Sequence, residues 1–327
     1  MAVTPVIAAS FLTSVEEFFG QFAAVGWFSL ILGCAFFGGF LTLRSRACFN
    51  VLRAAYPTER FPWRNIWGAY VAAYGVNMVF PARFGNIVRL FLTKTSIPNS
   101  SYPAVASSFV VDTVFDLTVA VPILIFAFTQ GVFPKPPDFS KLNAFDLSYL
   151  AAHPQFTLFL LTFLTVLVLV LFAFLSVRVR AFWARVRQGV TILTDRRRYF
   201  REVWSVQAVA WFSRFAAFWC FLDAFHVGGS VRNVLLVYGV AAVSSLIPLT
   251  PGGAGVQQAL LVKVFAGSAA GATVAAYSVG QQIAIAAFSA GLGFVALALV
   301  FRMRSFKEVI RRGREDRDSQ QAAEAAT

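Results

Sequence analysis

The chain is poor in the residues that metal sites, disulfides and acid–base centres need. It has only two histidines, His153 and His226, and three cysteines among 327 residues. The histidines lie in separate loops and the cysteines show no pair spacing, so we expect no metal, cofactor or disulfide. Charged residues make up 13% of the chain, about half the share in a soluble domain.

Long apolar runs take the place of the missing charges. Hydrophobic residues make up 58% of the sequence, and the mean hydropathy is +0.69. A helix of ~20 apolar residues spans a bilayer. The clearest runs of this length are Gly26–Leu43, Ala104–Phe128, Phe156–Val177, Val203–Leu222 and Val274–Phe301. The composition predicts an all-α, polytopic helical membrane protein.

The net charge of +13 does not indicate a nucleic-acid partner, because the basic residues lie between apolar runs. Basic loops stay on the cytoplasmic side of a membrane. The basic segments Arg44–Arg64 and Arg178–Glu202 and the tail after Phe301 are therefore predicted to be cytoplasmic. The nearly neutral loops Thr129–Gln155 and Asp223–Arg232 are predicted to be external. The N-terminus is then external and the C-terminus cytoplasmic, in a plasma or inner membrane.

Two P-x-x-x-G breaks interrupt apolar sequence, at Pro81–Gly85 and at Pro251–Gly255. The predicted topology makes Asn65–Lys94 enter and leave on the cytoplasmic face, and Val231–Phe265 on the external face. Short Gly/Pro-interrupted segments at corresponding positions of two halves indicate the binding site of a transporter. We therefore predict two broken re-entrant hairpins in an inverted repeat.

These assignments divide the chain into three parts. Residues 1–25 form an N-terminal interfacial segment, and residues 302–327 form a basic to polar cytoplasmic tail. Residues 26–301 form one membrane domain. It contains repeat one (26–128), a connector helix (156–177) and repeat two (203–301).

Arginines and acids within the apolar runs are the first candidate site residues. Arg83 lies within the first break, and Arg89 lies six residues further on, in a helix that starts near Gly85 and directs its N-terminus at the bend. An arginine and a helix N-terminus suit a phosphate; alternatively, both arginines snorkel to the headgroups. Asp112 and Asp116 share a helix face.

The two acids need a partner, a proton or water. Arg83, Arg89 and Arg214 are the candidate partners, and Arg214 lies in the middle of a run, where it should face a cavity. The acids are either part of a charge network around a cavity, with a proton on one of them, or a structural ion pair that locks the hairpin to its neighbour.

The second break offers backbone groups and neutral amides instead of charge. Gly252, Gly253 and Gly255 permit close approach of another group, and Gln257 and Gln258 follow them. They are candidate substrate contacts, or else positions of close helix packing. For Gln281 and Gln282 in the last run, hydrogen bonding between helices is the simpler interpretation.

Three segments together resemble a known family. Asn77–Arg89 reads N-M-V-F-P-A-R-F-G-N-I-V-R, Val114–Leu117 reads V-F-D-L, and Pro251–Val256 reads P-G-G-A-G-V. They are similar to the N-x-x-x-P-A-R-x-G-E-x-x-R, E-R-x-F-D-L and P-G-G-x-G-V segments of the lysylphosphatidylglycerol synthase transmembrane (flippase-like) family. The resemblance covers roughly Gly26 to Phe301.

The resemblance implies a protein that moves or handles polar lipids or lipid-linked sugars. Only a short tail follows Phe301, so the soluble aminoacyltransferase activity is not expected. The chain departs from the family at Asn86 and Gln258, where Glu is usual, at Asp112-Thr113, where Glu-Arg is usual, and at Gln281 or Gln282, near a usual Arg. Apart from Asp112, these departures replace oppositely charged residues of the family pattern by neutral ones, in pairs.

Three functions remain open on the sequence. The favoured one is a flippase or scramblase for a polar lipid, with anionic headgroups or polyprenyl phosphates as partners. A membrane-embedded lipid-modifying or glycosyl transferase would use Asp112 or Asp116 as a base. A non-catalytic scaffold of a cell-envelope enzyme is the third. The sequence does not decide between a monomer and a homo-oligomer.

Overall fold

The computed structural model describes residues 20, 24–79, 84–130, 132, 184–245, 255–267 and 269–301. Throughout this part of the chain the regular structure is helical, which confirms the predicted all-α class. The helices are α2 (Trp27–Ala55), α3 (Trp63–Val79), α4 (Gly85–Ser96), α5 (Tyr102–Thr129), α8 (Arg196–Tyr199), α9 (Ser205–Ala224), α10 (Val231–Ser245), α11 (Val256–Phe265) and α12 (Gly271–Val300). A 3-10 turn, η3 (Thr191–Thr194), precedes α8, and a π-helical turn, η4 (Phe200–Trp204), joins α8 to α9.

Four helical stretches are long and apolar enough to cross a membrane. They are Trp27–Ala55, Tyr102–Thr129, Arg196–Ala224 and Gly271–Val300. Large apolar side chains point away from the protein on these helices; Phe28, Phe128, Phe212 and Leu299 are each at least 70% exposed. Such an outer surface suits lipid, so the chain is an integral membrane protein.

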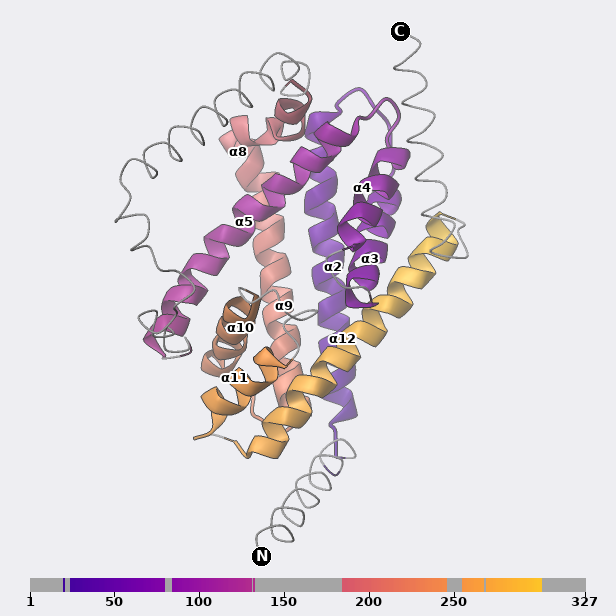
Figure 1. The fold of residues 1–327 in the computed structure, drawn as a ribbon. Helices are drawn as coiled ribbons and strands as arrows, with labels where there is room; N and C mark the ends of the chain where they lie inside the picture. The colour runs from indigo at the N-terminus through magenta and orange to yellow at the C-terminus, as the bar shows by residue number, and fades with distance from the viewer. Residues whose placement is uncertain are drawn as a thin grey trace, which may run out of the picture.

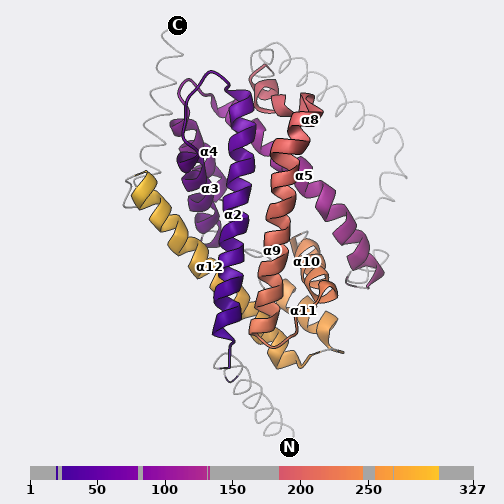
Figure 2. The same ribbon diagram turned by 180° about the vertical axis from the view of Figure 1, so that it is seen from behind.

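The long helix α2 is the centre of the bundle. It packs along α9, and α3 packs against both α2 and α12 (Figures 1 and 2). Close approach of α3 and α12 depends on Gly75, because a Cβ there would lie 2.6 Å from the carbonyl oxygen of Ser289. Small residues allow membrane helices to pack this closely.

Each predicted break lies between two shorter helices. The first pair, α3 and α4, has 17 and 12 residues, and the second pair, α10 and α11, has 15 and 10. At 1.5 Å per residue, each helix is shorter than the ~30 Å hydrocarbon core. The order long, short, short, long therefore occurs twice, whereas re-entry from opposite faces stays a prediction.

The predicted loop Arg44–Arg64 is wrong in its first half, because α2 continues to Ala55. The loop was predicted to begin at Arg44 because the basic residues begin there, but the helix continues beyond the end of its apolar run. Arg44, predicted to be a loop residue, is instead a buried residue of α2, only 7% exposed. The predicted connector 156–177 lies outside the described residues.

Candidate functional site

The first half-helix after the break begins at a glycine that has no room for a side chain. A Cβ on Gly85 would collide with the carbonyl oxygen of Ala73 and lie 2.7 Å from the Asn77 side chain. The Gly85 N–H donates a 2.7 Å hydrogen bond to Oδ1 of Asn77. Because the first N–H groups of a helix lack partners within it, Asn77 of α3 stabilises the start of α4.

Arg89 lies one turn into α4 and forms an ion pair with α5. Its Nη2 donates to Oδ2 of Asp112 at 2.7 Å and contacts Sγ of Cys48 at 3.0 Å. The rings of Tyr70 and Phe109 lie 4.5 and 3.9 Å from its guanidinium carbon. Its side chain is 12% exposed, so Arg89 does not snorkel to the headgroups. Of the three arginines predicted as candidate partners for the acids, Arg89 is the one that pairs with Asp112.

Asp116, one turn further along α5, pairs with an arginine that the sequence did not suggest. Arg44 donates from Nη1 and Nη2 to the two carboxylate oxygens, at 2.7 and 2.9 Å. Its Nε donates to the Tyr70 hydroxyl at 3.2 Å. Two parallel bonds from one guanidinium to one carboxylate are a strong, directional arrangement.

Gln207 of α9 joins the two ion pairs. Its Nε2 donates to Oδ1 of Asp112 at 2.8 Å, and its Oε1 accepts from Nη1 of Arg44 at 3.2 Å. Gln207 is fully buried, and Asp112 is 5% exposed. We call the whole set the interior charge network: Arg44, Cys48, Tyr70, Arg89, Asp112, Asp116 and Gln207.

The interior charge network is electrically balanced and connects α2, α3, α4, α5 and α9. Two arginines face two aspartates, so no net charge remains among its members. The Arg89–Asp112 pair is buried, with side chains 12% and 7% exposed, whereas the Asp116 carboxylate is 43% exposed. Breaking the buried pair costs several kcal/mol, because one ion is left without compensation. The pairing supports the interpretation of Asp112 and Asp116 as structural ion-pair partners that hold the first hairpin against its neighbouring helices.

Arg214 of α9 has different surroundings. Four aromatic rings, those of Phe40, Trp211, Phe218 and Tyr238, lie 5.0–5.6 Å from its guanidinium carbon. None of the ion pairs found in the described residues involves it. It pairs with neither Asp112 nor Asp116, so that candidate partnership is wrong.

Hydrogen-bond donors without acceptors gather around Arg214. Within the part of the chain that the structure describes, no acceptor meets three buried donors, Nε of Arg214, Nε1 of Trp211 and the Tyr238 hydroxyl. The rings of Trp211 and Tyr238 lie 5.5 Å apart. We call Arg214, Trp211, Tyr238, Phe40 and Phe218 the Arg214 cluster.

The interior charge network and the Arg214 cluster lie along the same helix faces. Gln207 and Arg214 are seven residues apart on α9, which is about two turns or ~10 Å along the axis. On α9, the network and the Arg214 cluster therefore share one helix face. On α3, Tyr74 follows Tyr70 by one turn.

The second break is held by amides. The Gly255 N–H donates to Oε1 of Gln258 at 2.6 Å. Nε2 of Gln258 then donates to Oε1 of Gln282 at 3.1 Å, and Nε2 of Gln282 donates to Oε1 of Gln257 at 3.3 Å. The expected bonding between helices is confirmed for Gln282, and the same bonds join α11 to α12.

Several predicted site residues lie outside the described residues. They are Pro81, Arg83, Pro251, Gly252 and Gly253. The structure brings Arg89, Asp112 and Asp116 together and places Gly255, Gln257 and Gln258 at the other break. Sequence reasoning missed Arg44 and Gln207. A helical pattern extended past Leu43 would have placed Arg44 on α2, whereas an uncharged Gln207 gave no signal.

Comparison with models of known protein families shows which family the chain belongs to. The model described as the lysylphosphatidylglycerol synthase TM region matches residues 1–293, so the chain belongs to that family. Comparison with curated proteins and with solved structures finds no match.

Proposed function

We propose that this member of the lysylphosphatidylglycerol synthase TM family moves a polar, phosphate-bearing lipid between the two leaflets of its membrane. The observation that carries the proposal is the Arg214 cluster. It places a cation and unpaired donors in the middle of α9, within the stretch Arg196–Ala224 that is long and apolar enough to span the bilayer.

A charge at this depth is costly. Insertion of an arginine at the centre of a membrane helix costs roughly 2.5–3.5 kcal/mol, and such residues face partners or pathways. The other two interior arginines, Arg44 and Arg89, have carboxylates within 2.7 Å. Arg214 has aromatic rings and unpaired donors instead. A phosphate group supplies the missing negative charge and several acceptor oxygens at once.

The surrounding rings favour a lipid as the source of that phosphate. Aromatic side chains pack against apolar chains, and the buried N–H of Trp211 and hydroxyl of Tyr238 have no hydrogen-bond partner among the described residues. The two helix breaks lie in the same bundle, as the site of a two-repeat transporter would require.

The enzyme alternative is weaker, because both candidate bases are held in ion pairs between helices. Asp112 accepts from Arg89 and Gln207, and Asp116 accepts two bonds from Arg44. A general base must instead be directed at the proton that it removes from the substrate. The scaffold alternative predicts that substitution of Arg214 leaves the rate of lipid exchange unchanged.

Lipid exchange in proteoliposomes tests the proposal. Fluorescent phosphatidylglycerol and a polyprenyl-phosphate probe are assayed for access to an impermeant quencher, with imposed ion gradients in parallel. We expect faster exchange with wild type than with empty vesicles, and at least ~10-fold slower exchange with Arg214→Met, as loss of a charge-assisted hydrogen bond implies. Arg232→Met is the matched control, since Arg232 bonds only Gln130 at the surface among described residues. Equal exchange by the Arg214 and Arg232 variants would contradict the proposal.

A further inference from the structure

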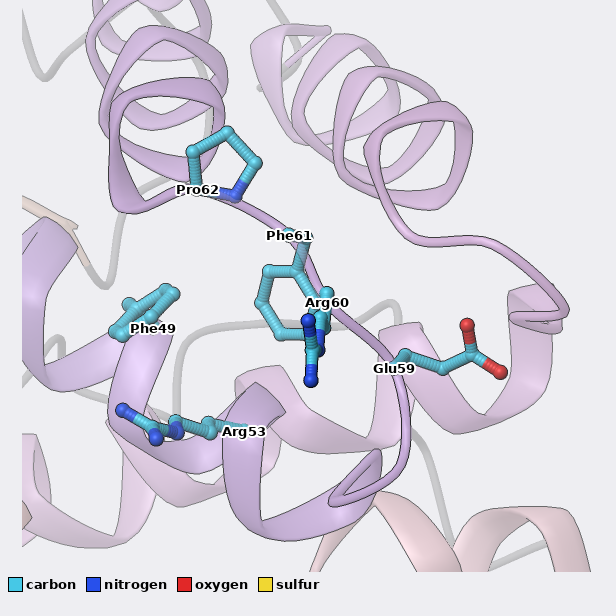
Figure 3. A pocket seen from close by; sticks show the side chains of 6 residues that line it. All are labelled: Phe49, Arg53, Glu59, Arg60, Phe61 and Pro62. Atoms are coloured by element: carbon cyan, nitrogen blue, oxygen red, sulfur yellow. The ribbon is translucent and has the colours of Figure 1, made fainter.

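A second site with phosphate-binding chemistry lies at the end of α2, far along the helix from the Arg214 cluster. A pocket of about 370 Å³ opens there, within the size range of small-ligand sites. It is lined by Phe49, Arg53, Glu59, Arg60, Phe61 and Pro62 (Figure 3). Nothing in the interior charge network or the proposed translocation uses these residues.

The pocket has an aromatic floor and a basic rim. Phe49 and Phe61 are both buried, and their rings meet edge to face with centroids 5.4 Å apart. Arg53 follows Phe49 by one turn on α2, and Figure 3 shows its guanidinium beside Phe49 and that of Arg60 beside Phe61. A third arginine, Arg46, stacks over Phe49 at 5.1 Å.

The one carboxylate of the lining is engaged elsewhere. Oε1 of Glu59 accepts a 3.1 Å hydrogen bond from Nδ2 of Asn99, in the turn between α4 and α5. Figure 3 shows the Glu59 side chain directed away from the two arginines. Among the described residues, no ion pair involves Arg53 or Arg60. With two arginines and one glutamate, the lining carries a net charge of +1, and neither arginine is paired with that glutamate.

The loop that forms the rim is held in place before any ligand binds. Besides the Glu59–Asn99 bond, the Tyr56 hydroxyl accepts from the Ser101 N–H at 3.3 Å. Nε2 of Gln188 donates to the carbonyl oxygen of Ala55 at 3.0 Å. Three contacts from other segments thus hold the loop at Ala55, Tyr56 and Glu59, and preorganisation lowers the cost of binding.

We propose that this pocket binds a phosphate group, with Arg53 and Arg60 as its ligands and the Phe49–Phe61 pair against the adjoining apolar part. The location favours the headgroup of an anionic lipid. The same end of the bundle carries α8, which begins with three arginines (Figure 1), and clustered basic residues at a membrane surface attract anionic lipids. A soluble phosphate monoester has the same binding chemistry.

The test uses the full chain in neutral detergent, titrated calorimetrically with dioctanoyl phosphatidic acid, with glycerol 3-phosphate and with dioctanoylglycerol. Binding of the lipid alone identifies a lipid headgroup, and equal binding of glycerol 3-phosphate identifies a soluble phosphate compound. Binding of dioctanoylglycerol as tight as that of phosphatidic acid, or binding of no probe, overturns the proposal.

Variants separate this pocket from the Arg214 cluster. Arg53→Gln with Arg60→Gln should weaken phosphate binding at least ~10-fold, since two charge-assisted bonds are lost. Arg185→Gln with Arg187→Gln removes the same charge from exposed positions nearby and should change affinity less than ~3-fold. Glu59→Gln keeps an acceptor for Asn99, removes the negative charge and should tighten binding. Equal affinity of the Arg53/Arg60 and Arg185/Arg187 variants for phosphatidic acid contradicts the proposal. Loss of binding in Arg214→Met alone also contradicts it, because the lipid then binds at the Arg214 cluster and not in this pocket.

Discussion

The two helix breaks begin their returning helices in the same way and attach them differently. At both, a glycine N–H donates to a side-chain amide oxygen, from Gly85 to Asn77 and from Gly255 to Gln258. The returning half-helix then bonds to the long helix that follows. α4 does so through the ion pair of Arg89 with Asp112, and α11 through the amides of Gln258 and Gln282.

The difference shows two ways of joining a half-helix to its neighbour inside a membrane. An ion pair is strong while intact, but loss of one partner leaves a charge in a low-dielectric interior. An amide pair is weaker and leaves only a polar group behind. The first half of the molecule should therefore be the more sensitive to substitution. The paired loss of charge expected from the family pattern agrees with the direct contact of Gln258 with Gln282.

The largest effect should come from breaking the ion pair at the first break. Asp112→Asn leaves Arg89 without compensation, and we expect a loss of about 3–5 kcal/mol in the free energy of unfolding. Gln282→Leu at the second break should cost about 1–2 kcal/mol. Equilibrium unfolding in mixed micelles measures both. Equal losses would remove the distinction between the breaks.

Alanine substitution of Gly85 and Gly255 compares the backbone requirements of the two breaks. In Gly85→Ala the new methyl collides with the Ala73 carbonyl, so we expect a cost of about 1–3 kcal/mol or more from overpacking. Gly255 has open space but a φ of +86° and a ψ of −57°, which L-residues rarely adopt, so Gly255→Ala should cost about 1–3 kcal/mol from strain. Thermal unfolding in detergent ranks them. A less stable Gly255 variant would show that backbone strain outweighs crowding here.

The smallest effect belongs to the amide pair itself. A double-mutant cycle with Gln258→Leu and Gln282→Leu should give a coupling energy of about 0.6 kcal/mol, and no more than ~1.7 kcal/mol. The cycle separates the pair from the loss of the Gly255 cap, because the cap is absent in both variants that contain Gln258→Leu. A coupling as large as that of a buried ion pair would mean that amides and ions join these helices equally well.

The sequence predicted the helical membrane class and the positions of the two segments between shorter helices, and it named Arg89 as one of three candidate partners for Asp112 and Asp116. The length of the apolar runs and the four-residue spacing of Asp112 and Asp116 depend only on residues close in the chain, so the sequence alone reveals them. The Arg44–Asp116 pair was missed because an arginine after an apolar run is normally a loop residue by charge counting. Only the packing of α2 against α5 and α9 shows that Arg44 is inside.

The Arg214 cluster illustrates a different limit. Its arginine was predicted to face a cavity or a partner, because a mid-span charge is costly. The surrounding rings come from α2, α9 and α10, and sequence distance gives no measure of their approach. Phe40 and Tyr238 could not be selected among 37 phenylalanines and eight tyrosines.

The most direct test of the account measures stability and lipid exchange on the same two variants. The account assigns Asp112 to holding the helices together and Arg214 to the lipid. Arg214→Met should therefore unfold at the same or a higher temperature than wild type, because an uncompensated charge is removed, while exchange is lost. Asp112→Asn should lower the unfolding temperature. An Arg214 variant that is destabilised as much as Asp112→Asn, with exchange intact in the folded fraction, would contradict the account.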